Sequence, residues 1–289
     1  MKKIGNLFLI ILILSLLIVN FDDPEQKVIK YFPFDEDIKF TDNSTNLSLI
    51  SQTDEDSYKV QWDIQSKLEQ DIYLRQDVSL LFVDGKLKGI LNQWKEKANE
   101  LKQETLLNGE DSSHYEAITL HHGEVHYPDD VIKSIQMMSH DELYVIDSPH
   151  SPLESFKEPG NSNEKEWKKT LNRTKTQALN HYWNELMRHY ELSSEDYLEI
   201  PLADLWQYQQ KNLPTLTRKQ TDQVIGQLWE GLYQNYIIGI KSHQDKEYNA
   251  INTYMPLILV DKKGKFIYVL FRDESGQNHR LIQRVPEFS

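Results

Sequence analysis

The sequence predicts an α+β fold made mostly of antiparallel sheet, with amphipathic helices packed on one face of that sheet. Three observations lead to this class. Strand-like alternation opens the ordered part of the chain, helical periodicity dominates its middle, and three apolar segments separated by turn residues end it. Because three strands alone make a weak unit, we expect the C-terminal meander to share one sheet with the N-terminal strands. An N-terminal membrane-anchor helix precedes this domain.

Composition and charge limit the class of partner. Of the 289 residues, 39% are hydrophobic, which is enough for a packed core, and the chain contains no cysteine. With 32 basic and 45 acidic side chains, the formal net charge is −13. Both nucleic acid and anionic lipid attract basic surfaces, so we expect no nucleic-acid partner and no electrostatic docking on lipid.

The first 21 residues have the pattern of a membrane anchor. Lys2 and Lys3 precede an apolar run at residues 7–19, and Asp22 and Asp23 follow it. This charge order predicts a cytoplasmic N-terminus and an exported C-terminal part. The residues after the run are bulky for a cleavage site, so we expect residues 1–21 to remain as a single-pass anchor in a bacterial cell membrane. The alternative is secretion after signal cleavage.

Residues 22–56 are expected to form an acidic, flexible spacer. They carry ten acidic residues against three lysines, a composition that offers little apolar surface for burial. The ordered extracytoplasmic domain is therefore expected to cover residues 57–289. Within it, residues 147–163 concentrate Pro, Ser, Gly and Asn and are the expected internal linker.

The first half of the domain is predicted to be mostly strands. Val60, Trp62 and Ile64 alternate with polar residues, and an apolar run at 78–83 leads into a turn at Asp84 and Gly85. Further strands are expected at residues 115–120 and 143–146. Two helices are expected between them, at 91–107, where apolar residues recur at helical spacing, and at 131–138.

The second half is predicted to be helical first and then extended. A long amphipathic helix is expected at residues 167–186, a shorter one at 204–211, and a third that opens with a capping box at Thr217 and Gln220. The meander strands follow at 257–260, 266–271 and 281–285, separated by Gly-containing polar turns.

Motifs for nucleotide, acyl-transfer and zincin chemistry are missing from the sequence. There is no G-x-G-x-x-G, P-loop, G-x-S-x-G or H-E-x-x-H. One S-x-x-K match, from Ser162 to Lys165, lies at the start of the long helix without the K-T-G that accompanies it in serine acyltransferases. Catalytic residues therefore stay unknown at this level.

Histidines supply the strongest chemical signal. Six of the ten fall between residues 114 and 150. If residues 122–126 form one strand, its two-residue period puts His122, Glu124 and His126 on one face, where they could bind a divalent metal. If Gly123 instead makes a tight hairpin, His121 and Glu124 become cross-strand neighbours. We expect the hairpin, and the metal ligands to consider are then His121, His122, Glu124 and His126.

Two tryptophans define a second candidate site. Trp183 and Trp206 lie in the helical half, where tyrosines are also frequent. On an exposed surface they could stack on sugar rings or anchor a protein partner. The alternative is that the aromatic residues form the core stripe of amphipathic helices.

These observations lead to three functional hypotheses. The leading one is a membrane-anchored, extracytoplasmic interaction or sensing module of the cell envelope, non-catalytic and without a cofactor, whose partner is an envelope protein or cell-wall polymer. The second is a metal-dependent hydrolase that uses the histidine and glutamate ligands named above, with Asp129 or Asp130 as base. The third is a cell-wall glycan-binding module that uses the two tryptophans.

Overall fold

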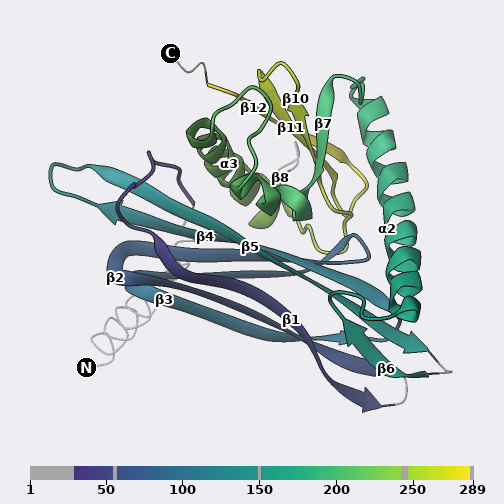
Figure 1. The fold of residues 1–289 in the computed structure, drawn as a ribbon. Helices are drawn as coiled ribbons and strands as arrows, with labels where there is room; N and C mark the ends of the chain where they lie inside the picture. Colours follow the sequence, from purple (N-terminus) through teal and green to yellow (C-terminus); the bar gives the residue numbers. More distant parts are fainter. Residues whose placement is uncertain (1–28, 55–56, 149–150, 242–246, 287–289) are drawn as a thin grey trace, which may run out of the picture.

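Long antiparallel strands dominate the architecture. A computed structural model describes residues 29–54, 57–148, 151–241 and 247–286 (Figure 1). The chain is 52% strand and 23% helix. The larger sheet contains β1 (Phe40–Asp54), β2 (Ser57–Val83), β3 (Lys86–Gly109), β4 (Ser113–His126), β5 (Ile132–Ser148) and β6 (Ser151–Phe156). The smaller sheet contains β7 (Tyr197–Pro201), β10 (Leu257–Asp261), β11 (Phe266–Arg272) and β12 (Asn278–Arg284).

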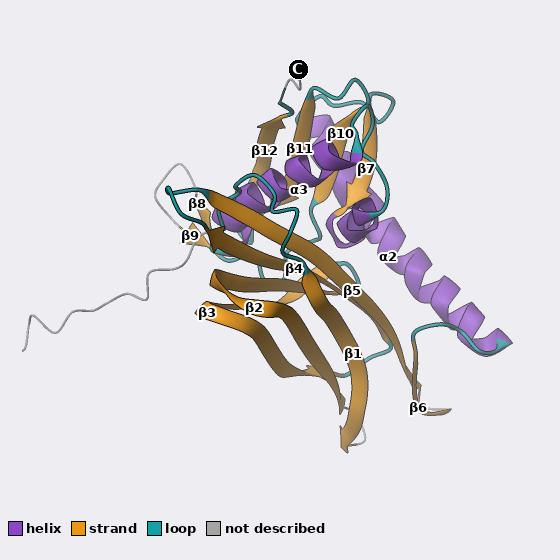
Figure 2. Ribbon diagram, turned by 60° about the vertical axis from the view of Figure 1, so that its left-hand side comes forward, coloured by secondary structure: helices purple, strands orange, loops and turns teal. Residues whose placement is uncertain are grey.

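The larger sheet is folded over along β2 and β3. β3 pairs with one edge of β2 from Tyr58 to Val83, while the other edge of β2 pairs first with β1 and then with β4. A register shift between Lys67 and Ile72 breaks the β2–β3 ladder in the middle, and such irregularities let a strand bend. The sheet therefore curves until it nearly closes on itself, with β1 crossing over β4 and β5 (Figure 2).

Each face of the curved sheet packs against a different hydrophobic core. The inner core gathers apolar residues from both halves of β2, among them Trp62 and Leu81, with Leu47 of β1. The outer face of β2, β4 and β5 shares a larger core with the helices and the smaller sheet. The molecule thus has two apolar layers separated by the second half of β2, β4 and β5.

The helices lie on the outer face of the curved sheet. They are α2 (Ser162–His189), the 3-10 helix η1 (Leu202–Gln209), α3 (Arg218–Leu232) and the π-helical turn η2 (Tyr233–Ile237). Thr217 and Gln220 form the predicted capping box at the start of α3, which is confirmed. A short pair of strands, β8 (Ile240–Lys241) and β9 (Glu247–Tyr248), follows η2.

The predicted fold class, α+β with one shared antiparallel sheet, is wrong. The fold is mostly antiparallel sheet, and the C-terminal meander pairs with β7 rather than with the N-terminal strands. β7 follows α2 in the chain and aligns with β10 from Pro201 to Tyr197, so the meander gains its fourth strand locally. The smaller sheet consequently needs no partner from the N-terminal half.

Two predicted helices are strands. Residues 91–107 belong to β3 and residues 132–138 to β5, because each segment finds a long antiparallel partner. Pairing with β2 and β4 supplies more stabilisation than the helix propensity of these residues, which is a weak preference.

The predicted anchor lies outside the described residues, as does the first part of the predicted spacer. Of the helices in the described part of the chain, none combines the length and the apolar composition of a membrane span. Residues 40–54 differ from the expected flexible spacer, since they form β1 and bury Leu47 in the inner core. The expected linker at 147–163 likewise contains β6.

Candidate functional site

The predicted hairpin at Gly123 is absent from the structure. β4 runs without interruption from Ser113 to His126, and Gly123 pairs with Arg75 of β2 and Ile135 of β5. A side chain here would collide with Ile72 and Ile135, because an ideal Cβ at Gly123 would lie 2.4 Å from Ile72 Cδ1. Gly123 is therefore explained by close packing inside the sheet, and the alternative of a continuous strand is the correct one.

His121 points into the curved sheet and belongs to a buried polar network. Its Nδ1 lies 3.0 Å from Asp77 Oδ2, and its Nε2 lies 2.7 Å from Ser139 Oγ. This carboxylate, imidazole and hydroxyl order is the connectivity of a catalytic triad. However, Ser139 Oγ also lies 2.6 Å from Thr45 Oγ1 of the covering strand β1, so the hydroxyl is already held on its other side.

The polar network extends beyond Asp77, His121 and Ser139. Asp77 Oδ2 accepts a hydrogen bond from Ser66 Oγ at 2.5 Å, and the guanidinium of Arg75, which is fully buried, bonds to Ser66 and to the Asn99 carbonyl. We call this set the Asp77 network; its members are Thr45, Ser66, Arg75, Asp77, Ser79, Thr119, His121 and Ser139. Buried charges need such partners; here Asp77 lies at ion-pair distance from Arg75 and His121, while Arg75 Nε, Asp77 Oδ1 and His121 Nδ1 make no hydrogen bond among the described residues.

The remaining predicted metal ligands do not join His121. Strand alternation puts His122, Glu124 and His126 on the opposite face of β4 from His121. His126 Nε2 lies 3.4 Å from Glu124 Oε2, whereas His122 is buried, and that burial lowers its pKa to about 4. Among the described residues, no three histidine or carboxylate side chains are grouped so that they could hold a metal ion.

Two other histidines pack on the outer face of the curved sheet. His114 Nε2 lies 3.1 Å from Glu142 Oε2, and its ring stacks on Tyr144. Although burial alone would raise it, hydrogen bonds from His114 and Lys168 lower the pKa of Glu142 to about 2. His140 stacks on Trp206 with ring centroids 5.1 Å apart, and His150 lies outside the described residues.

Neither predicted tryptophan forms an open aromatic surface. Trp183 is buried, and its Nε1 donates to the Met255 carbonyl at 2.8 Å. Trp206 is half-buried in its stack with His140. The alternative in which these aromatic residues belong to the core agrees with the position of Trp183.

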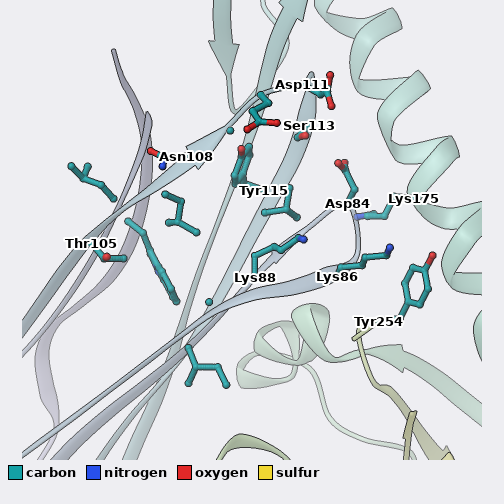
Figure 3. A pocket seen from close by; sticks show the side chains of 18 of the residues that line it. Asp84, Lys86, Lys88, Thr105, Asn108, Asp111, Ser113, Tyr115, Lys175 and Tyr254 are labelled. Atoms are coloured by element: carbon teal, nitrogen blue, oxygen red, sulfur yellow. The ribbon is translucent and has the colours of Figure 1, made fainter. Parts of the chain in front are cut away.

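A pocket that holds none of these predicted residues lies beside the edge strand β3 (Figure 3). It has a volume of about 890 Å³ and is lined by both ends of β3, the β3–β4 turn, α2 and Tyr254. We call it the β3 pocket; its polar and charged lining is Asp84, Lys86, Lys88, Thr105, Asn108, Glu110, Asp111, Ser113, Thr174 and Lys175. A volume in this range suits a small ligand or a short peptide.

Three lysines gather at one end of the β3 pocket. Figure 3 shows Lys86, Lys88 and Lys175 reaching toward the same region, with Asp84 beside them and Asp111 at the other end. Lys175 Nζ is 2.8 Å from Glu116 Oε1 and is therefore paired. Lys86 Nζ lies over the Tyr254 ring and Lys88 Nζ donates to the Asn252 amide oxygen; within the described residues neither has a carboxylate at ion-pair distance.

A hairpin turn and a β-bulge set the positions of Lys86 and Lys88. Asp84 and Gly85 both have positive φ, 49° and 79°, which identifies the tight turn predicted from the sequence. The register then shifts between Leu81 and Phe82, so Lys88 is the extra residue of a bulge. Bulges of this kind re-aim a side chain, and here the re-aimed residue lines the pocket.

Trp62 forms the apolar floor of the β3 pocket. It comes from the far half of β2 and packs beneath Gly89, where an added Cβ would lie 2.9 Å from the indole ring. Its Nε1 is buried and, among the described residues, has no hydrogen-bond acceptor. An unmet buried donor costs on the order of 1–3 kcal/mol, and Trp62 carries this cost inside the protein.

The β3 pocket was missed from the sequence. The turn at Asp84 was predicted, but Lys86 and Lys88 after it read as ordinary solvated residues of a strand. The one available signal was that both lysines follow a tight turn in an acidic chain with no acid next to them. Nothing in the sequence indicated that Trp62 and Lys175 line the same pocket, since their proximity depends on the bend of β2 toward α2.

Comparison with known proteins gives no further guide, since the chain matches no protein-family model and no curated protein.

Proposed function

We propose that this protein is a non-catalytic binding module that holds an anionic ligand in the β3 pocket. The observation that carries the proposal is the pair Lys86 and Lys88, whose ammonium groups line the pocket without a carboxylate partner among the described residues. The rest of the pocket wall includes apolar residues such as Leu91 and Leu107. The ligand therefore needs both an anionic group and an apolar part.

Electrostatics supports this ligand class. A chain of net charge −13 repels anions over most of its surface, so an anion needs a local positive site to bind. Each charge-assisted hydrogen bond from a lysine contributes on the order of 1.5–3 kcal/mol. Lys86 and Lys88 can supply two.

The Asp77 network supports a non-catalytic function. Its Ser139 and His121 are the residues whose geometry most resembles a nucleophile and base, and they lie under β1 rather than in the β3 pocket. Together with the sequence pattern of an anchor, this leads us to propose an extracytoplasmic interaction or sensing role, with the ligand supplied by an envelope protein or cell-wall polymer.

A matched pair of small probes tests the proposal. Benzoate carries an apolar ring and an anionic group, and benzamide is its neutral counterpart. We expect ligand-observed NMR on the purified full-length protein to detect benzoate but not benzamide. The double variant K86Q/K88Q should weaken benzoate binding by at least about tenfold, because it removes both ammonium groups.

The control is K95Q/K97Q, which removes two exposed lysines from the same strand outside the pocket. It should bind benzoate like the wild type. Equal benzoate binding by wild type and K86Q/K88Q would contradict the proposal, as would the absence of benzoate binding to the wild type.

A further inference from the structure

We infer that the ligand of the β3 pocket is an extended acidic peptide that adds to the sheet as a strand along the free edge of β3. This inference rests on the proposed function and names the chemical class of its ligand. It follows from the strand edge that borders the pocket and from Lys86 and Lys88, which have no carboxylate at ion-pair distance among the described residues.

The backbone of β3 is available for pairing. One edge of β3 is occupied along its whole length by β2. On its other edge, backbone pairing among the described residues is confined to the start of the strand, where Lys86 bridges Tyr254 and Leu87 exchanges hydrogen bonds with residues 252 and 253. Residues 89–91 and 105–109 border the pocket beyond that point. An exposed strand edge of this kind is a template for an incoming strand.

The two arms of β3 make this edge unlike an ordinary sheet edge. Because β2 and β3 bend together, residues 86–91 and 105–109 of the same strand both line one pocket. Gly89 and Gly109 lie within these arms, where they make room for the protein's own aromatic rings: an added Cβ would lie 2.9 Å from Trp62 and 2.4 Å from Tyr58, respectively.

The lysines select the charge of the incoming strand. Lysine on a sheet edge discourages pairing with other strands, which protects proteins from edge-to-edge aggregation. Acidic side chains reverse this effect, since Lys86 and Lys88 then gain the partners they lack among the described residues. At the end of the pocket that holds Lys86 and Lys88, the same device therefore disfavours a basic segment and admits an acidic one, while Glu110 and Asp111 line the other end.

The apolar part of the pocket fits the alternation of a strand. Side chains of an extended peptide point alternately to opposite sides, with a rise of about 3.3 Å per residue. One side can meet Lys86 and Lys88 while the other packs on apolar residues of the wall.

Three peptides separate strand addition from simple anion binding. The test peptide is acetyl-Glu-Leu-Glu-Leu-Glu-Leu-amide. The second has the same sequence with the three leucine amide nitrogens methylated, which removes backbone donors and keeps the charge. The third replaces each glutamate with lysine. Affinities are measured by isothermal titration calorimetry on the full-length protein, wild type, K86Q/K88Q and the control K95Q/K97Q.

We expect the test peptide to bind the wild type and the control equally. The methylated peptide should bind at least about thirtyfold more weakly, because three hydrogen bonds are lost. The lysine peptide should not bind. Hydrogen exchange followed by mass spectrometry should show slower amide exchange at residues 89–91 and 105–109 when the test peptide is bound.

The outcomes distinguish failure of this inference from failure of the proposed function. Equal affinity for the test and methylated peptides, with weaker binding to K86Q/K88Q, would overturn strand addition and leave an anion site. Binding of benzoate without binding of any peptide would do the same. Peptide affinity that is unchanged in K86Q/K88Q would place binding elsewhere and overturn both.

Discussion

The Asp77 network and the β3 pocket are both polar regions of the curved sheet, but the Asp77 network is sealed inside the sheet, whereas Lys86 and Lys88 line an open pocket. Arg75, Asp77 and His121 are fully buried and contact one another or nearby hydroxyl and carbonyl groups. In the β3 pocket, Lys86 and Lys88 have no carboxylate partner among the described residues. The difference that matters is access: buried side chains under β1 contribute to the fold, whereas ammonium groups that line a pocket can meet a ligand.

Histidine enrichment therefore marked a structural region. His121 completes the Asp77 network, His122 is buried on the other face of the same strand, and His114 pairs with Glu142. The β3 pocket is lined by lysines, which are common in any sequence. Composition therefore identified polar residues that pack inside the fold, whereas only the geometry identified the pocket.

The largest expected effect is on stability, through the Asp77 network. Asp77→Ala leaves Arg75 as a buried cation without its carboxylate, which should destabilise the fold by about 3–5 kcal/mol. Urea unfolding followed by far-UV circular dichroism measures the change. A loss below about 1 kcal/mol would show that the network is not the closed structural region described above.

Stability should also depend on pH through His122. Its pKa falls from 6.5 to about 4 in the folded protein, because burial disfavours the charged ring. The unfolded chain then binds the extra proton between these values, so stability is lost as the pH falls from about 6.5 to 4, in total on the order of 3 kcal/mol. His122→Leu should flatten this dependence.

The matched control for this pH dependence is His181→Leu, which removes an exposed histidine. Its unfolding free energy should follow the wild-type pH curve between 4 and 6.5. The assignment to His122 fails if His122→Leu and His181→Leu give the same slope.

A substitution at the floor of the β3 pocket should have a smaller effect on stability. Gly89→Ala adds a Cβ 2.9 Å from the Trp62 ring, and the resulting overpacking should cost about 1–3 kcal/mol. The control Gly231→Ala adds a Cβ in α3 with nothing within 4 Å and should be neutral or stabilising by up to about 1 kcal/mol. Thermal unfolding of both variants is the measurement. Wild-type stability in Gly89→Ala would mean that the two arms of β3 are not packed together through Trp62.

The smallest expected stability effect belongs to the lysines themselves. K86Q/K88Q should change the free energy of unfolding by less than about 0.5 kcal/mol, because neither ammonium group is in an ion pair among the described residues. Urea unfolding beside the wild type checks this. A loss above about 1.5 kcal/mol would make the lysines structural and remove the contrast between the two regions.

Local signals in the sequence were sufficient for elements that form locally. The tight turn at Asp84, the cap at Thr217 and the three meander strands occupy the predicted positions, since each depends on residues a few positions apart. β3 was assigned as a helix because its apolar residues recur at three- and four-residue spacing. That spacing arises in the structure because an edge strand bent around the sheet changes which of its sides is covered.

The β3 pocket could not be predicted for a related reason. Lys88, Trp62 and Lys175 come from three elements, and the bend in β2 brings them to one pocket. No spacing rule connects them. Likewise, the burial of His121 depends on β1 crossing β4 and β5, in a segment whose acidic composition predicted a spacer.

The most direct test of the central claim, that the β3 pocket is the binding site, is to observe its lysines during ligand titration. Reductive methylation with ¹³C-formaldehyde gives each lysine an NMR signal. The signals of Lys86 and Lys88 are assigned by their loss in the K86R and K88R variants. Titration with benzoate should shift the signals of Lys86 and Lys88 along one saturable curve and leave those of Lys95 and Lys97 unmoved. Saturable benzoate binding that leaves the Lys86 and Lys88 signals unchanged would contradict the claim.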